Sequence, residues 1–158
     1  MSDATAPRII AIANQKGGVG KTTTAINLGA ALAETGQKTL IIDLDPQGNA
    51  STGLGIAASD REISTYDLLI EQTSISEVVR ETGTAGLWIA PATTDLSSAD
   101  IELGSTEKRS HLLHSALRTA DMAGLGFTFV LIDCPPSLSL LTVNAMVAAH
   151  SVLVPLQS

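Results

Sequence analysis

The chain has 158 residues, 44% hydrophobic and 16% charged, which suits one α/β domain and excludes a globally disordered segment. Its formal net charge of −7 argues against a broad nucleic-acid surface on this segment. The apolar runs are only strand-length and residues 1–7 are polar, so neither a membrane span nor a signal peptide is predicted.

Strands and helices are predicted to alternate along the chain. Short apolar runs predict strands at residues 8–13, 38–43, 87–90, 127–133 and 151–155. The intervening patterns predict helices at residues 21–35, 65–71, 74–80, 107–122 and 138–149. Residues 44–57 predict a long functional loop with a short helical turn. This order predicts a three-layer α/β fold with a mostly parallel sheet flanked by helices.

Burial is expected for several of these elements. The helix at residues 21–35 is apolar on all sides and is predicted to be buried against the sheet. The last strand, SVLVP, is predicted to be buried as well. Cys134 is the single cysteine, which excludes an internal disulfide framework and a self-contained cysteine metal cluster. We expect it to be a small buried residue.

The turn after the first strand is rich in glycine and lysine. Glycines allow several backbone N–H groups to point at one anion, and the N-terminus of the following helix adds partial positive charge. Lys21 would reach the β- and γ-phosphates of a nucleotide, and the Thr22 hydroxyl would ligate Mg²⁺. The usual pattern G-x-x-x-x-G-K-[ST] is not fully met, because Gln15 replaces its first glycine and a second lysine, Lys16, follows. The sequence predicts a P-loop that departs from the standard pattern at these positions.

Carboxylates end two of the predicted strands. Asp133 follows the apolar run FTFVLI and suits the acidic group that holds magnesium in a P-loop ATPase. Asp43 and Asp45 end the second strand, where alternation places both side chains on one side. Such a pair could position the attacking water or sense the γ-phosphate. A simple turn former after a strand is the competing interpretation for each of these residues alone.

Five segments together resemble the ParA/Soj partition ATPases of the ParA/MinD superfamily. These segments are NQKGGVGKTTTAINLG at 14–29, DLDPQGNAS at 43–51, DLSSADIEL at 95–103, DCPPSL at 133–138 and LLTVNA at 140–145. The resemblance covers essentially the whole chain. It implies one P-loop ATPase domain over residues 1–158, of the AAA_31 or CbiA-like type and lacking its C-terminal part.

The resemblance also implies roles for individual residues. Lys16 is similar to the lysine that reaches the partner's phosphates across a nucleotide-sandwich dimer, and Gly17 would lie close to that dimer interface. Asp45 is similar to the aspartate that positions the hydrolytic water. The implied catalytic residues are Lys16 and Asp45. The implied nucleotide-binding residues are Lys16, Gly17, Gly18, Val19, Gly20, Lys21, Thr22 and Thr23, and the implied metal-binding residues are Thr22, Asp43 and Asp133.

The implied activity is an ATP-dependent switch with ATP and Mg²⁺ as cofactors. ATP would close a homodimer, the dimer would bind DNA non-specifically, and a ParB-type partner would trigger hydrolysis. DNA binding is expected of the complete protein and not of this acidic segment. A cytoplasmic, nucleoid-associated location without a membrane partner is expected.

Other interpretations remain open beside this one. MinD-type division-site ATPases share the fold and both lysines, but usually carry glycine where this chain has Gln15. A module that binds nucleotide without turnover is a further possibility. Iron–sulphur relatives need two cysteine ligands per subunit, which Cys134 alone does not supply. His111 and His114 could bind metal but have no apparent third ligand. The acidic residues between Asp60 and Glu81 are expected on solvated faces of short helices, and basic residues such as Arg61 form no basic stripe among them.

Overall fold

The computed structural model describes residues 6–13 and 19–155 as a three-layer α/β structure. Its strands are β1 Arg8–Ile12, β2 Thr39–Asp43, β3 Arg80–Glu81, β4 Leu87–Ala90, β5 Phe129–Asp133 and β6 Ser151–Leu153. Its α-helices are α1 Val19–Glu34, α2 Asn49–Gly53, α3 Thr65–Leu69, α4 Ile75–Val78, α5 Ala99–Glu102, α6 Leu112–Ala116, α7 Ala120–Gly124 and α8 Leu140–Ala148. Short 3₁₀ turns are η1 Ala58–Asp60, η2 Thr94–Ser98 and η3 Arg109–His111.

The strands form one six-stranded sheet in the order β3-β4-β2-β5-β1-β6. All neighbouring pairs are parallel except β3 with β4, which is antiparallel. The predicted α/β class and mostly parallel sheet are therefore confirmed. The two-residue strand β3 was not predicted from the sequence, since so short an edge strand has no periodic pattern of its own.

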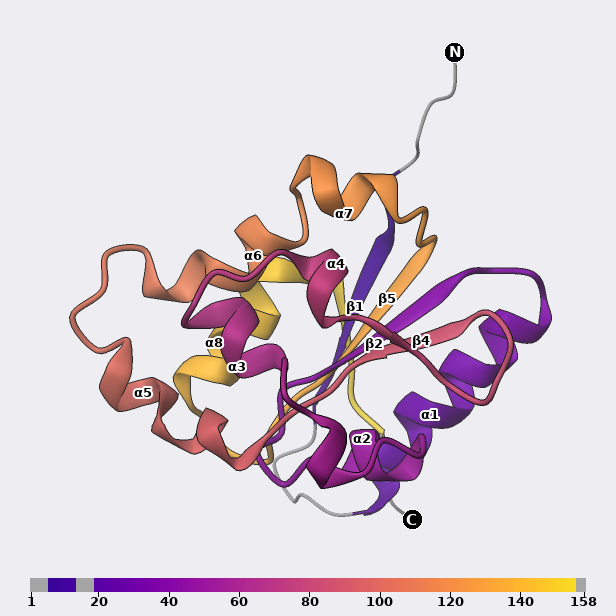
Figure 1. The fold of residues 1–158 in the computed structure, drawn as a ribbon, viewed down its shortest axis with the longest axis horizontal. Coiled ribbons are helices and arrows are strands. Elements are labelled where there is room, and N and C mark those ends of the chain that lie inside the picture. The colour runs from indigo at the N-terminus through magenta and orange to yellow at the C-terminus, as the bar shows by residue number, and fades with distance from the viewer. Residues whose placement is uncertain (1–5, 14–18, 156–158) are drawn as a thin grey trace.

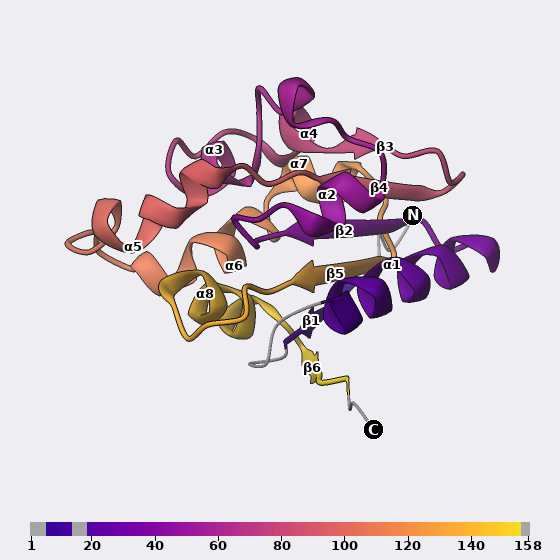
Figure 2. The same ribbon diagram turned by 90° about the horizontal axis from the view of Figure 1, so that it is seen from below.

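The two faces of the sheet are covered differently, as Figure 2 shows. On one face α1 packs against β2, β4 and β5, and Gly29 allows its close approach. A Cβ atom at Gly29 would lie 3.0 Å from the Cδ1 atoms of both Ile41 and Leu87. The opposite face is covered by the short helices α3, α4, α6, α7 and α8. Strand alternation supplies both cores, because Ile41 points to the α1 side while Leu40 and Ile42 point to the other.

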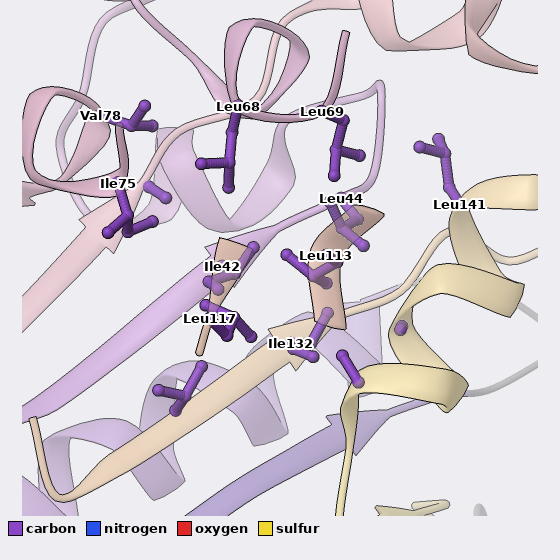
Figure 3. Packing of buried hydrophobic residues seen from close by; sticks show 14 of the residues in the cluster. Ile42, Leu44, Leu68, Leu69, Ile75, Val78, Leu113, Leu117, Ile132 and Leu141 are labelled. Atoms are coloured by element: carbon purple, nitrogen blue, oxygen red, sulfur yellow. The ribbon is translucent and has the colours of Figure 1, made fainter. Parts of the chain in front are cut away.

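The core under the short helices is built from aliphatic side chains, as expected from an aromatic content of 3%. Figure 3 shows Ile42 and Ile132 of the sheet and Leu44 of the following loop close to side chains from the covering helices. These side chains are Leu68, Ile75, Val78, Leu113 and Leu117, the last of which directly follows α6. Each fully buried aliphatic side chain contributes about 1.5–3 kcal/mol of transfer free energy. Because Leu44 belongs to this core, the packing also holds the start of the loop that follows β2.

The single helix predicted for residues 107–122 is wrong. This segment forms η3, α6 and α7, with a break between Leu117 and Thr119. Thr119 has an extended backbone (ψ 160°), and its hydroxyl accepts a hydrogen bond from the N–H of Met122 at 3.1 Å. Thr119 therefore caps a new helix instead of continuing the old one. Arg118 stabilises the break by donating to the carbonyls of His114 and Ala148.

The burial predicted for two other elements is only partly correct. In α1 the inward residues are buried, while Asn27 and Ala31 on its outer side are exposed. The strand predicted as buried at residues 151–155 is β6, which lies at the edge of the sheet and pairs only with β1. Val152 and Val154 are 47% and 53% exposed. An apolar run predicts a strand, but it does not predict the strand's place in the sheet.

Candidate nucleotide site

Three strands end at the same edge of the sheet, beside the N-terminus of α1 (Figure 1). The register of the parallel strands pairs Ile12 and Asp43 with Asp133, so β1, β2 and β5 end side by side. The segment between β1 and α1, the loop from β2 to α2 and the loop from β5 to α8 follow these ends. This is the edge at which parallel α/β sheets bind ligands.

Lys21 and Thr22, in the first turn of α1, both contact Asp133. Lys21 Nζ donates to Asp133 Oδ1 in a buried ion pair, and Thr22 Oγ1 donates to Asp133 Oδ2 at 3.2 Å. Lys21 is 1% exposed and Asp133 is fully buried. Burial raises the pKa of Asp133 above its ordinary value, although the Lys21 ammonium opposes that rise. A cation, a hydroxyl and a carboxylate thus meet at the start of a helix that follows a glycine-rich segment.

Asp43 is held by a different set of donors. Its carboxylate accepts hydrogen bonds from the backbone N–H of Asp45 at 3.1 Å and of Ser51 at 3.0 Å, and from Ser51 Oγ at 2.7 Å. Burial raises the pKa of Asp43 to about 7, with the Ser51 hydrogen bond opposing the rise and the nearby Asp133 adding to it. Both carboxylate oxygens are engaged in ordering the loop that follows β2.

Asp45 lies in that loop and is 4% exposed. Its Oδ1 accepts a hydrogen bond from the backbone N–H of Gln47 at 3.0 Å, which forms a turn of the Asx type. Its charge is near enough to contribute to the raised pKa of Asp133. The turn interpretation and the functional interpretation of Asp45 are therefore compatible, because one oxygen orders the loop and the other forms no hydrogen bond to a described residue.

The structure brings five of the predicted site residues to one edge of the sheet: Lys21, Thr22, Asp43, Asp45 and Asp133. Thr23 is exposed, and Gly20 accepts a hydrogen bond from the Thr24 hydroxyl through its carbonyl at 2.7 Å. Val19 begins α1. The predictions for Lys16, Gly17 and Gly18 lie outside the described residues.

The donor set near Asp133 suits a hard divalent cation. Thr22 and Asp133 present oxygen atoms, which Mg²⁺ prefers, and their side chains already lie within hydrogen-bond distance. Within residues 6–13 and 19–155, His, Cys, Asp and Glu side chains form no group of three that could hold a metal ion by themselves. The His111 and His114 rings pack edge to face with centroids 6.0 Å apart. Any metal here would depend on the hydroxyl and on ligands from a nucleotide.

Two residues that order this site were missed by the sequence analysis. Ser51 ends the motif DPQGNAS, which was recognised, but its hydrogen bonds to Asp43 and Ala92 were not predicted. Arg61 was noted only as one of several basic residues that form no stripe, yet it is buried beside α2, and its hydrogen bonds to described residues go to carbonyl and hydroxyl oxygens. Nothing in the local pattern distinguishes Arg61 from its exposed neighbours, because its partners lie as far away as Ala92.

Other predicted features have simpler outcomes. Cys134 is a buried free thiol, as predicted, and burial raises its pKa to about 12. In the part of the chain that is described, no helix is long and apolar enough to span a membrane.

Comparison with known proteins gives one matching family and several similar partition proteins. The AAA domain family AAA_31 matches residues 7–158. The chromosome partitioning protein ParA of Caulobacter vibrioides is 56% identical over 150 residues, which cover 95% of this chain and 56% of that protein. The sporulation initiation inhibitor protein Soj of Bacillus subtilis is 47% identical over 95% of this chain and 58% of its own length. The chain thus spans a little over half the length of these relatives.

A solved structure with bound nucleotide is also similar. It is described as cobyrinic acid a,c-diamide synthase from Mycobacterium smegmatis with bound ATP analogue and magnesium. It has a TM-score of 0.87 and 42% identity, and the match covers 95% of this chain and 60% of that one. These comparisons confirm the resemblance to ParA/Soj proteins and the P-loop type of α/β fold.

Proposed function

The chain belongs to the AAA domain family whose model spans residues 7–158, and on that premise we propose that it is the ATP-binding part of a magnesium-dependent DNA-partitioning ATPase. The observation that carries the proposal is the contact of Lys21 and Thr22 with Asp133 at the N-terminus of α1. A cation, a hydroxyl and a carboxylate together at a helix N-terminus support the binding of a nucleotide's phosphates there. We propose residues 1–158 as a single ATPase domain.

Lys21, Thr22 and Asp133 would bind the nucleotide's phosphates and its metal. The Lys21 ammonium has three N–H donors, so it can keep a bond to Asp133 while donating to phosphate oxygens. Thr22 and Asp133, with Asp43 acting through water, would hold Mg²⁺. When bound, this ion neutralises charge on the phosphate oxygens. Backbone N–H groups between Lys16 and Thr23 would bind the remaining phosphate oxygens.

Asp45 would orient the water that attacks the γ-phosphate. Its loop lies beside Asp133, and among the described residues its Oδ1 accepts a hydrogen bond from Gln47 while its Oδ2 accepts none. Lys16 would stabilise charge on the phosphoryl group of a partner subunit in an ATP-dependent homodimer. Closure of that dimer by ATP would be the switch, since a ligand shifts an equilibrium only through contacts that differ between the two states.

The partners proposed for the complete protein follow from the relatives. The relatives named for chromosome partitioning favour a DNA-segregation role, with a ParB-type protein as stimulating partner and a nucleoid-associated location in the cytoplasm. With a net charge of −7 in this segment, non-specific DNA binding would depend on other residues of the complete protein.

Three different functions have weaker support. The structural neighbour described as cobyrinic acid a,c-diamide synthase names a different activity, but the Caulobacter protein with 56% identity is named for chromosome partitioning. A MinD-like division-site ATPase would share this fold, and a nucleotide-binding module without turnover would share the phosphate site. Lys21, Asp45 and Asp133 at one edge favour turnover over simple binding.

ATP binding and hydrolysis by the purified protein and two variants test the proposal. Lys21→Ala should abolish nucleotide binding, whereas Asp45→Ala should bind ATP with nearly unchanged affinity and stop turnover. Normal hydrolysis by Asp45→Ala would refute the role of Asp45, and tight ATP binding by Lys21→Ala would refute the phosphate site.

The mass of the Asp45→Ala protein in solution tests the switch separately. We expect a dimer with Mg²⁺-ATP and a monomer with Mg²⁺-ADP. A monomer in both conditions, with ATP still bound, would contradict ATP-dependent dimerisation by this chain.

A further inference from the structure

Arg61 is a buried arginine without an acidic partner among the described residues. It follows the turn η1 and is 8% exposed. Its Nε and Nη2 donate to the carbonyl of Ile56 at 3.0 and 2.6 Å, Nη1 donates to the carbonyl of Ala92 at 3.1 Å, and Nη2 donates to Thr52 Oγ1 at 2.9 Å. Within residues 6–13 and 19–155 its guanidinium forms no ion pair. A buried charge without a counter-charge is costly, so what this side chain adds is the fixed geometry of the segments that it joins.

The segments joined by Arg61 frame the loop that carries Asp45. Thr52 belongs to α2, the helix at the end of this loop. Ala92 comes two residues after β4, the strand that pairs with β2. Gly48 lies against the guanidinium, since a Cβ atom there would be 2.4 Å from Arg61 Nη1. Gly48 also has φ +66°, a conformation that favours glycine, and its N–H donates to the carbonyl of Asp45 at 2.8 Å. The guanidinium therefore packs directly against the turn that contains Asp45.

The same loop is held from its other side by Ser51. The Ser51 hydroxyl donates to Asp43 at 2.7 Å and accepts from the backbone N–H of Ala92 at 3.0 Å. The Ala92 backbone thus uses its N–H for Ser51 and its carbonyl for Arg61. These two contacts hold α2 to the end of β4, and α2 and Asp43 together hold the Asp45 turn between them.

We propose that Arg61 is a positioning residue for ATP hydrolysis, which fixes the Asp45 turn by fastening α2 to Ala92. This inference rests on the proposed function of Asp45. Arg61 itself would touch neither nucleotide nor water. A small displacement of a group that orients the attacking water lowers turnover strongly without a matching change in nucleotide binding.

Arg61→Gln tests this role because it removes the fork of donors and keeps a polar side chain of similar length. We expect kcat for ATP hydrolysis to fall roughly 10- to 100-fold, with the dissociation constant for ATP changed less than about 3-fold. The control is Arg118→Gln, which removes an exposed arginine that also donates to two backbone carbonyls, those of His114 and Ala148, away from the Asp45 loop. The control should keep the wild-type kcat and the wild-type exchange rates in the Asp45 loop.

Amide hydrogen exchange supplies a second measurement that needs no hydrolysis. In Arg61→Gln the amides of Gly48, Thr52 and Leu54, which form the hydrogen bonds of this loop, should exchange at least about 10-fold faster than in the wild type. Amides of β4 and β5 should exchange at the wild-type rate. If Arg61→Gln does not fold, Thr52→Val removes one of the acceptors and should produce the same pattern at smaller amplitude.

The outcomes separate this inference from the proposed function. A normal kcat with unchanged exchange in the loop overturns the role of Arg61, and so does equal acceleration of exchange throughout the protein. A wild-type protein that binds but never hydrolyses ATP refutes the proposed function, and loop exchange then decides alone whether Arg61 holds the turn.

Discussion

Asp43 and Asp133 end neighbouring strands in the same register, yet their surroundings differ in kind. Both side chains are fully buried, and burial raises the pKa of each. Asp43 is held by neutral donors from its own loop, with Ser51 only eight residues away in the sequence. Asp133 is held by a cation from α1, and Lys21 is 112 residues away. The end of a parallel strand sets where a carboxylate lies, but its neighbours set what the carboxylate does.

The largest effect should come from separating the Asp133 ion pair. Lys21→Met leaves a buried carboxylate without its cation and should lower the free energy of unfolding by about 3–5 kcal/mol at pH 7. The double variant Lys21→Met/Asp133→Asn should recover most of that loss, because no charge is left unpaired. Urea unfolding measures both, and a double variant as unstable as the single one would contradict the pairing.

At Asp43 the expected effect is a dependence of the free energy of unfolding on pH. Its folded-state pKa of about 7 lies above the ordinary value of 3.8, so the folded protein binds more protons than the unfolded chain between those values. Stability should therefore fall as pH rises from about 4 to about 7, by at most about 4 kcal/mol. Asp43→Asn should show a smaller slope, since Asp133 also has a raised pKa and still contributes, and urea unfolding at several pH values measures both slopes. Identical slopes in the two proteins would show that Asp43 titrates normally.

Ser51→Ala measures how much the local hydrogen bonds around Asp43 contribute to stability. It removes a donor to Asp43 and an acceptor for Ala92, so we expect a loss of about 1–3 kcal/mol in the free energy of unfolding. Ser97→Ala is the control, since the Ser97 hydroxyl is exposed and donates to the nearby carbonyl of Thr94, and its loss should cost less than about 0.5 kcal/mol. Equal losses in the two variants would mean that the Ser51 contacts add nothing specific.

The residues that follow the two aspartates, Leu44 and Cys134, are also buried. The reactivity of the Cys134 thiol tests how tightly the chain packs after β5. Burial raises its pKa to about 12, so the reactive thiolate is scarce at pH 8. We expect the native protein to react with a thiol reagent at least about 1000-fold more slowly than the urea-unfolded protein. Rapid labelling of the native protein would show that the loop after β5 opens readily.

The predictable part of the site is the part that depends on local order. The glycine-rich turn before Lys21 and the strand ending in Asp133 are continuous patterns, and a parallel sheet brings such strand ends together. Asp43 and Asp45 were found for the same reason. Arg61 was missed, because its acceptors are three carbonyl and hydroxyl groups that only the folded chain assembles around it.

The sequence by itself determined the α/β class, the positions of the main strands along the chain and the position of α1, because apolar periodicity and β-branched runs act over a few residues. Tertiary structure alone decided the burial of Arg61 and the pairing of Lys21 with Asp133. Each of these depends on which distant segment supplies a hydrogen-bond partner or covers an apolar face. Local pattern carries no information about that partner, whereas the free energy of burying a polar or charged group depends on it.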